Sequence, residues 1–516
     1  MTMMITRRGL LASASLAAAY AVAPRGAHAA AASPLRLTAE RRTLDVNGKP
    51  ASVFGLRQPD GTQGVVLAPD QRFLVELANR TDEPTIIHWH GQTPPVRQDG
   101  VTNTGLEAVI APGASQGYDF VPRPGTHWMH SHHGLQEQLL MAAPLVVRTA
   151  EDVHADAQEI VVLLHDFTFR DPNEVLAGLT RSTSKEATKG GKQAHAMPGM
   201  AMDHDRMPGM EMDNHAMPDM DMGGHAAMKP VATPSGTGTA KTGMVMDLND
   251  IDYDAYLAND RTLTDPLVVR TERNGRVRLR LINGATSTAF WIDLGGSEGT
   301  VVGVDGDPVH PVPLRRFPMA QGQRVDVVLQ MPQGGGAVPV LAQREGDRQR
   351  TGLILATPDA AIAKVADLAD AKVGAVDLSL ERQLRAVSPL SSRPADVVHE
   401  VALAGTMMPY RWTLNGHTWA NHQPLVVSKG HRVELDLVNR SQMAHPMHLH
   451  GHHFQVIALN GQRMAGAMRD TVLVPVNGRV RVAFDADNPG RWLFHCHNLY
   501  HMATGMMTEV AYSNFA

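Results

Sequence analysis

The stretch PGRWLFHCHNLYHMATGM, residues 489–506, carries the most informative side chains of the 516-residue chain. It contains the only cysteine, Cys496, flanked by His495 and His497. Because successive side chains of a strand point to opposite faces, the two imidazoles project together and the thiol projects away from them. A strand with this sequence can therefore present a thiolate to a metal on one face and two imidazoles to a second site on the other face.

The thiol side of this stretch has the residues of a blue-copper site. A thiolate, two imidazoles and a weak thioether are the ligands that such a site uses. His501 and Met506 follow Cys496 in the spacing Cys-x4-His-x4-Met, and His445 supplies the second imidazole. An inert buried cysteine is the alternative, but the position of the only cysteine favours the copper ligand. A single cysteine also excludes an intrachain disulfide framework.

The imidazole side belongs to a larger pattern of His-x-His pairs. Alternate residues of a strand share a face, so each pair can deliver both rings to one side. Eight imidazoles are more than one ion binds, and they suit a polynuclear site of a metal that accepts nitrogen ligands. One pair could arise by chance, whereas four pairs at matched spacings indicate a common site. The pairs are His88 and His90, His130 and His132, His448 and His450, and His495 and His497.

Three segments with alternating apolar and polar side chains predict an all-β fold that contains an internal repeat. They are residues 73–77, 277–281 and 433–437, which lead to Asn79, Asn283 and Asn439. Short strands separated by Gly and Pro favour antiparallel β-sandwiches with Greek-key connections. We therefore expect three related β-sandwich domains. Only the first and third contain His-x-His pairs, and in the first Ser131 takes the place of Cys496.

The repeat and the changes in composition give the expected domain boundaries. A connector that we expect to be partly helical separates the second domain from the third, and an insertion poor in large apolar side chains interrupts the second domain and is predicted to be disordered. The expected segments are a signal peptide 1–30, domains 31–150, 151–360 and 394–516, the connector 361–393 and the insertion 182–242.

The N-terminus has the pattern of a twin-arginine signal peptide. Arg7 and Arg8 precede an Ala-rich apolar run, and Ala27-His28-Ala29 is a small-x-small cleavage site. A buried helix or a membrane anchor is the alternative, but the run is too short to span a bilayer well. We expect export to the periplasm and no membrane span. The net charge of -5 gives no electrostatic reason to expect nucleic-acid binding.

The insertion contains a ten-residue repeat rich in Met and His. Thioethers are soft ligands that select Cu(I), so the repeat predicts a Cu(I)-gathering loop rather than a linker in which Met is incidental. Met443 and Met502 lie beside His445 and His501 in sequence, and they either bind a substrate Cu(I) or pack against the imidazoles. The repeat residues are Met197, Met200, Met202, His204, Met207, Met210, Met212, His215, Met217, Met220, Met222 and His225.

Taken together, the motifs His-Trp-His-Gly, His-Ser-His, His-Pro-x-His-x-His-Gly and His-Cys-His-x3-His-x4-Met resemble the copper motifs of three-domain multicopper oxidases. Within that family the chain resembles the periplasmic copper-resistance protein A group and the related cuprous oxidases. The resemblance implies three cupredoxin-like domains and four copper ions, one of type 1, one of type 2 and two of type 3. His88 and His448 would hold the type 2 ion. The type 3 ligands would be His90, His130, His132, His450, His495 and His497.

The resemblance also implies a reaction. Such an enzyme takes electrons singly at the blue site and reduces O2 to water at the three-copper cluster. Asp99 falls where the family keeps a proton-supplying carboxylate, although Asp-Gly is also a common turn pair. Several relatives carry Glu where this chain has Met502, which leaves part of the proton path open.

The electron donor is expected to be Cu(I), in copper tolerance. Alternatives are a laccase-like oxidase of phenols or aromatic amines, a copper store or carrier, and a structural protein with degenerate sites. The intact set of ligand residues argues against the last alternative. We expect a monomer.

Overall fold

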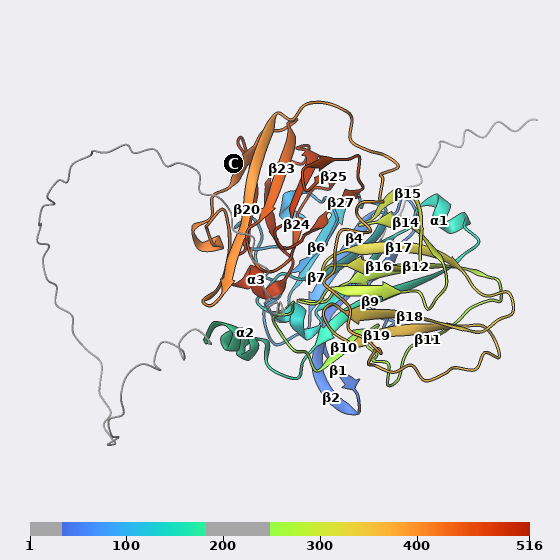
Figure 1. The fold of residues 1–516 in the computed structure, drawn as a ribbon. Helices are drawn as coiled ribbons and strands as arrows, with labels where there is room; N and C mark the ends of the chain where they lie inside the picture. Colours follow the sequence, from blue (N-terminus) through green and yellow to red (C-terminus); the bar gives the residue numbers. More distant parts are fainter. Residues whose placement is uncertain (1–32, 182–247, 516) are drawn as a thin grey trace, which may run out of the picture.

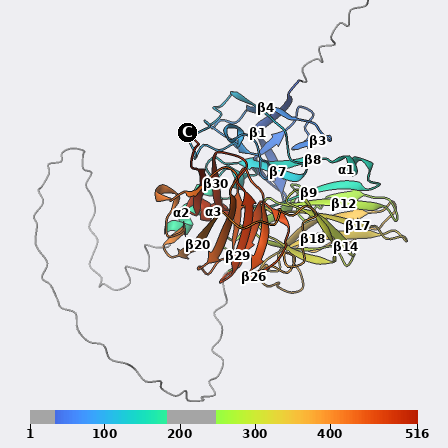
Figure 2. The ribbon, with the colours of Figure 1, turned by 90° about the horizontal axis from the view of Figure 1, so that it is seen from above.

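A computed structural model describes residues 33–181 and 248–515, whose regular secondary structure is mainly β-strand. The signal peptide and the methionine repeat lie outside the described residues. Six sheets pair into three β-sandwiches, as the sequence predicts. Figure 1 shows the third sandwich beside the second, and Figure 2, turned by 90°, shows the first sandwich against both. Among the described residues no helix is long and apolar enough to cross a membrane.

The first sandwich packs the sheet β2-β1-β4-β6 on the sheet β3-β8-β7-β5. Its strands are β1 (Leu35–Val46), β2 (Lys49–Arg57), β3 (Val65–Leu67), β4 (Phe73–Asn79), β5 (Ile87–His88), β6 (Ser115–Phe120), β7 (Gly125–Ser131) and β8 (Ala142–Val147). Two 3-10 helices, η1 (Val96–Gln98) and η2 (Gln136–Leu139), lie in its loops, and α1 (Ala150–His154) leads to the second sandwich.

The second sandwich has a six-stranded and a five-stranded sheet. Its helix is α2 (Pro172–Arg181), and its first six strands are β9 (Gln158–Phe167), β10 (Ala255–Ala258), β11 (Val268–Arg270), β12 (Arg276–Asn283), β13 (Phe290–Asp293) and β14 (Gly299–Val304). The remaining strands are β15 (Asp307–Leu314), β16 (Arg316–Met319), β17 (Arg324–Gln330), β18 (Ala337–Arg344) and β19 (Arg350–Ala356).

The third sandwich has a seven-stranded and a five-stranded sheet. Its first strands are β20 (Val397–Met407), β21 (Tyr410–Leu414), β22 (Leu425–Val427), β23 (Arg432–Asn439), β24 (His445–Leu449) and β25 (Phe454–Leu459). They are followed by β26 (Gln462–Arg463), β27 (Met468–Arg469), β28 (Thr471–Val474), β29 (Arg479–Asp485), β30 (Arg491–Cys496) and β31 (Met507–Tyr512). The short helices are η3 (Trp419–Asn421) and α3 (Leu499–Ala503).

The three alternating segments occupy equivalent strands, which confirms the internal repeat. The strands β4, β12 and β23 each lie between one parallel and one antiparallel neighbour. Each ends at a buried asparagine whose side-chain amide donates to carbonyl groups of the following loops. In the first and third sandwiches that loop leads directly to a strand that carries site histidines. The corner asparagine therefore fixes where those strands begin.

The connector between residues 361 and 393 contains no helix, so the expectation of partial helix is wrong. Val376, Leu378 and Leu380 are buried, and residues 379–383 form turns with hydrogen bonds from Arg382 N to Leu378 O and from Gln383 N to Leu380 O. A single bridge between Ala386 and Val309 joins the connector to β15 of the second sandwich. Residues of the second and third sandwiches share one continuous apolar cluster.

Asn283→Ala tests the corner asparagine in the sandwich without candidate ligands. Its amide donates to Thr288 O at 3.0 Å and Met319 O at 3.3 Å, and its oxygen accepts from Ala285 N. Buried groups left without partners cost about 1–3 kcal/mol. We expect a lower midpoint of thermal unfolding, measured by circular dichroism. The exposed Asn173→Ala is the control, and an equal midpoint for both variants would contradict the role of the corner.

Candidate metal centre

Two pairs of strands from different sandwiches deliver the eight histidines. In the first sandwich β5 pairs with β7, which places His88 opposite His130. In the third sandwich β24 pairs with β30, which places His448 opposite His495. Because side chains alternate along a strand, the second histidine of each His-x-His pair lies on the same side as the first. The two sheets meet where the first and third sandwiches touch, so all four His-x-His pairs face one buried space.

Within this space the ring nitrogens form two triplets that share no residue, and the remaining pair, His88 and His448, also groups with His90. The ligand nitrogens of each triplet lie within 4.8 Å of one another. Nε2 of His88 lies 3.5 Å from Nε2 of His448, and these two form the pair. The division matches two ions with three imidazoles each and one ion with two. The triplets are His90, His130 and His497, and His132, His450 and His495.

Hydrogen bonds between each imidazole and the protein determine which of its two ring nitrogens remains available to bind a metal ion. Nδ1 of His88 donates to Asp99 O at 2.8 Å, and Nδ1 of His448 donates to Asp470 O at 2.9 Å. Each bond fixes the tautomer and leaves Nε2 free. Nδ1 of His495 likewise donates to the carbonyl of Cys496 at 2.9 Å. The rings are thus held in place by the backbone before any ion binds.

Several ring nitrogens are buried and have no partner in the protein. They are Nδ1 of His90, Nε2 of His130, Nε2 of His132 and both nitrogens of His497. Burial lowers the pKa of these imidazoles, to about 3 for His497 and well below the usual value for the others. The rings are therefore neutral at pH 7, and unpaired buried nitrogens are costly. This donor set fits copper.

The predicted blue-copper residues also meet. Sγ of Cys496 lies 3.6 Å from Nδ1 of His445 and 3.7 Å from Nδ1 of His501. The other ring nitrogens are occupied, since Nε2 of His445 pairs with Ser441 Oγ at 2.7 Å and Nε2 of His501 with Asp250 Oδ2 at 3.0 Å. Burial raises the pKa of the thiol, so the metal-free site holds a proton on sulfur.

The fourth predicted ligand of this site is Met506, which is buried in the same apolar cluster as Cys496. Its carbonyl accepts a hydrogen bond from Cys496 N at 3.0 Å. The ring of Trp412 on β21 stacks on His501 at 3.9 Å between centroids. The site is therefore enclosed by apolar and aromatic side chains, as a centre that passes electrons without admitting water requires.

Asp99 is buried between His88 of the first sandwich and His450 of the third. Its Oδ2 accepts from Nδ1 of His450 at 2.9 Å, and its side chain is 1% exposed. It also ends η1 and precedes Gly100, so the turn and the contact with the site occur together. The carboxylate is separated by one imidazole, that of His450, from the triplet of His132, His450 and His495.

Four carboxylates near the site were missed by the sequence analysis. Glu137 contacts His130 Nδ1 at 2.9 Å, Asp470 contacts His90 Nε2 at 3.1 Å, and Asp250 contacts His501. Glu107 accepts from Gly100 N at 2.7 Å, and burial with the nearby Asp99 raises its pKa to about 7. Only Glu137 follows a histidine motif closely in sequence. No nearby sequence motif indicates that the other three carboxylates lie at the site.

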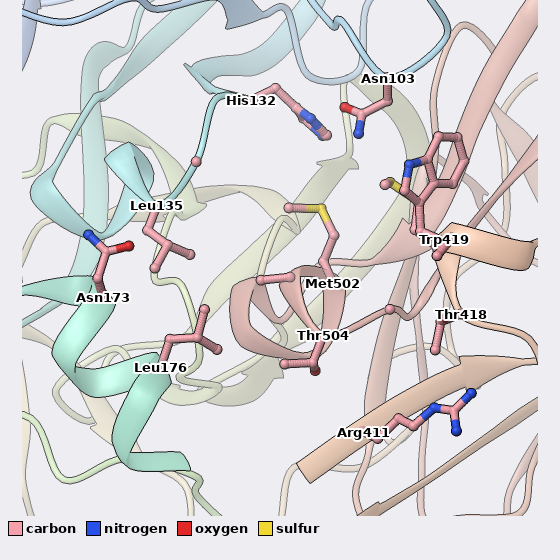
Figure 3. A pocket seen from close by; sticks show the side chains of 15 residues that line it. Asn103, His132, Leu135, Asn173, Leu176, Arg411, Thr418, Trp419, Met502 and Thr504 are labelled. Atoms are coloured by element: carbon pink, nitrogen blue, oxygen red, sulfur yellow. The ribbon is translucent and has the colours of Figure 1, made fainter. Parts of the chain in front are cut away.

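Met443 and Met502 lie on different cavities beside the blue-copper residues. Met502 follows His501 on α3 and faces a cavity of about 610 Å³ together with Trp419 and His132 (Figure 3). Met443 lines a second cavity of about 280 Å³ together with Leu248 and Glu345. The two methionines therefore do not share one docking pocket.

Comparisons with known proteins agree on one family. Family models described as multicopper oxidase match residues 61–152, 158–357 and 392–515. Multicopper oxidase MmcO of Mycobacterium tuberculosis is 33% identical, over 85% of this chain and 79% of the relative. Copper resistance protein A of Escherichia coli is 26% identical, over 84% of this chain and 85% of the relative. The crystal structure of a laccase from Botrytis aclada has a TM-score of 0.67 at 21% identity, over 93% of this chain and 87% of that chain.

Glu107→Gln tests the environment of the Glu107 carboxyl. The folded pKa of about 7 exceeds the ordinary value of 4.5, so this group favours folding at low pH and loses that contribution as pH rises to 7. Glutamine has no proton to lose. We expect the variant to unfold at a higher temperature than the wild type at about pH 8. At about pH 5 the difference in unfolding temperature should be much smaller. An equal gain at both pH values in calorimetry would contradict this assignment.

Proposed function

Because the chain belongs to the multicopper oxidase family, and is therefore a copper-dependent oxidoreductase, we propose that it oxidises Cu(I) and reduces O2 to water. The supporting observation is the segment 495–497. Its thiol lies 3.6 and 3.7 Å from the imidazoles of His445 and His501, and its two histidines belong to the two separate triplets. An electron received on the thiol side reaches both triplets through one residue of backbone.

In this proposal twelve residues hold four copper ions. Cys496, His445, His501 and Met506 would hold type 1, the pair His88 and His448 type 2, and the two triplets type 3. The bound ions would supply one-electron chemistry that accumulates the four electrons needed to reduce O2. The protein holds the imidazoles neutral and buried, and Asp99 delivers protons through its contact with His450.

Three observations support Cu(I) as the donor. Met443 gives the smaller cavity a thioether, which is a soft ligand for Cu(I). Ala444, which directly precedes the predicted ligand His445, lines the same cavity. Glu345 also lines it, and burial raises the pKa of Glu345 to about 7, so near neutral pH part of the population offers a carboxylate to a cation. A similar protein bears the name copper resistance protein A, which supports a role in copper tolerance.

A laccase-like activity is the second candidate, and the larger cavity is the observation that favours it. Leu135, Leu176 and Trp419 give this cavity apolar walls, while Asn103 and Arg411 supply polar groups. Such a mixture suits an aromatic donor. Met502 faces this cavity and follows His501 directly, so a bound phenol or aromatic amine would lie beside the blue-copper residues. We further propose a periplasmic monomer exported by the twin-arginine route.

Deletion of residues 190–230 tests the choice of donor. We expect the copper-loaded deletion variant to lose most of its O2 uptake with buffered Cu(I) and to keep its uptake with a phenol, because only Cu(I) needs the thioethers. Met443→Leu keeps the side-chain volume, and we expect it to raise the KM for Cu(I) without changing phenol turnover.

Cys496→Ser is the control for electron entry and should abolish uptake with both donors. If the wild type takes up O2 with a phenol but not with Cu(I), the laccase-like function would replace the proposed oxidation of Cu(I). Extra Cu(I) bound without any O2 uptake would replace it by copper storage.

Asp99→Asn tests proton delivery. The amide keeps the size and the polar contact with His450 but cannot release a proton at neutral pH. We expect O2 uptake to fall by roughly 100-fold or more, while anaerobic reduction of the blue band by the donor keeps its rate. A slowed anaerobic reduction, or unchanged O2 uptake, would contradict the role of Asp99.

A further inference from the structure

The second sandwich contributes no candidate ligand among the described residues, yet one of its turns touches the cluster. Residues 320–323 join β16 to β17 beside the histidine triplets. A Cβ on Gly322, which has a φ of +79°, would lie 2.9 Å from Cδ2 of His497 and 3.2 Å from Cε1 of His90. Only glycine fits so close an approach without displacing the rings. The turn therefore packs directly against two rings of the triplet that His90, His130 and His497 form.

Arg324 follows this turn and connects all three sandwiches. Its guanidinium is fully buried, with Nε donating to Thr126 O of the first sandwich at 3.2 Å. Nη1 donates to Gly322 O of the second sandwich at 3.0 Å and to Asp470 Oδ1 of the third at 2.6 Å. Nη2 donates to the other oxygen of Asp470, so the ion pair is bidentate.

Asp470, which pairs with Arg324, also accepts hydrogen bonds from two candidate ligands. Its Oδ1 accepts from Nε2 of His90 at 3.1 Å, and its backbone carbonyl accepts from Nδ1 of His448 at 2.9 Å. With Nε2 occupied, His90 is left with Nδ1, which is the nitrogen that has no partner in the protein. His90 therefore presents the opposite ring nitrogen from His88 and His448 because of a carboxylate that Arg324 holds.

The glycine of His-Trp-His-Gly leaves room for this ion pair. A Cβ on Gly91 would lie 2.3 Å from Nη2 of Arg324 and 2.7 Å from Oδ2 of Asp470. The ion pair is thus packed against the backbone that follows His90. A carboxylate buried this deeply needs its charged partner, since loss of one member of a buried pair leaves an uncompensated charge.

We propose that Arg324 is a positioning residue through which the second sandwich sets the ring nitrogen that His90 offers to the cluster and thereby the retention of cluster copper. The inference rests on the proposed copper cluster. The effect is expected at His90 and His448 and not at the blue-copper site, whose residues make no contact with Asp470 in the described structure. Partners of this kind change metal affinity by roughly 10–100-fold.

Arg324→Met tests the proposal against Arg280→Met as a matched control. Arg280 is also fully buried in the second sandwich and pairs with Asp152, Glu159 and Asp326, but none of these carboxylates contacts a site histidine. Both variants remove a buried charge, and both should unfold at lower temperature than the wild type. Only Arg324→Met should alter the cluster.

The measurements are copper per chain after dialysis against a graded chelator, the blue absorption band and the electron paramagnetic resonance spectrum. We expect Arg324→Met to release cluster copper at roughly 10–100-fold lower chelator concentration, to change the type 2 signal and to keep the blue band. Arg280→Met should retain copper as the wild type does. Equal copper retention by both variants would overturn the inference, whereas a wild type that binds no copper would overturn the proposed function instead.

Asp470→Asn provides a second test if Arg324→Met does not fold. It keeps the side-chain volume and removes the charge that Arg324 neutralises. We expect the same selective loss of cluster copper. In the double variant the loss should be smaller than the sum of the two single effects, because both act through one interaction. Additive losses, or wild-type copper retention in Asp470→Asn, would overturn the inference.

Discussion

Burial removes water from the eight imidazoles between the first and third sandwiches, and their nitrogens therefore need partners from the protein or from a bound ion. The protein supplies a partner for one nitrogen of most rings, through backbone carbonyls and the carboxylates of Asp99, Glu137 and Asp470. The remaining nitrogens point into the shared space and are left for metal. This requirement explains why Asp99, Glu137 and Asp470 are buried beside the imidazoles.

The three sandwiches share one construction and have diverged at the positions that carry chemistry. Each has the same central strand and the same corner asparagine. Cys496 lies opposite Met447 as Ser131 lies opposite Ile87, and the Ser131 hydroxyl donates to Gln136 at 2.7 Å where the cysteine faces two imidazoles. The described part of the second sandwich has no His-x-His pair, but its turn at Gly322 packs against His90 and His497, and its Arg324 pairs with Asp470. A sandwich that contributes no candidate ligand among its described residues thereby helps to form the site.

The fold and the histidine constellation could be predicted because their signals are local. Strand alternation fixes which residues share a face, and four His-x-His pairs with one cysteine leave few alternative arrangements. The carboxylates that orient the rings could not be found in this way. Arg324 and Asp470 are separated by 146 residues, and Asp99 and His450 by 351. The prediction of partial helix in the connector was wrong because it rested on the Ala, Asp and Leu content, whereas these residues form irregular chain and isolated turns against the second sandwich.

Described residues before and after the methionine-rich insertion lie near the predicted blue-copper residues. Before it, α2 contacts β21, whose Trp412 stacks on His501. After it, Leu248 lines the cavity of Met443, and Oδ2 of Asp250 lies 3.0 Å from Nε2 of His501. His501 is itself fully buried, so a donor cannot touch its ring directly and must deliver its electron through these neighbours. A cation held beside a carboxylate and a thioether can do so at short range, whereas an aromatic donor has to fit the larger cavity across α3. Under the proposed function the enclosure of His501 favours a small donor, and Met443 supplies a thioether in the cavity beside His445.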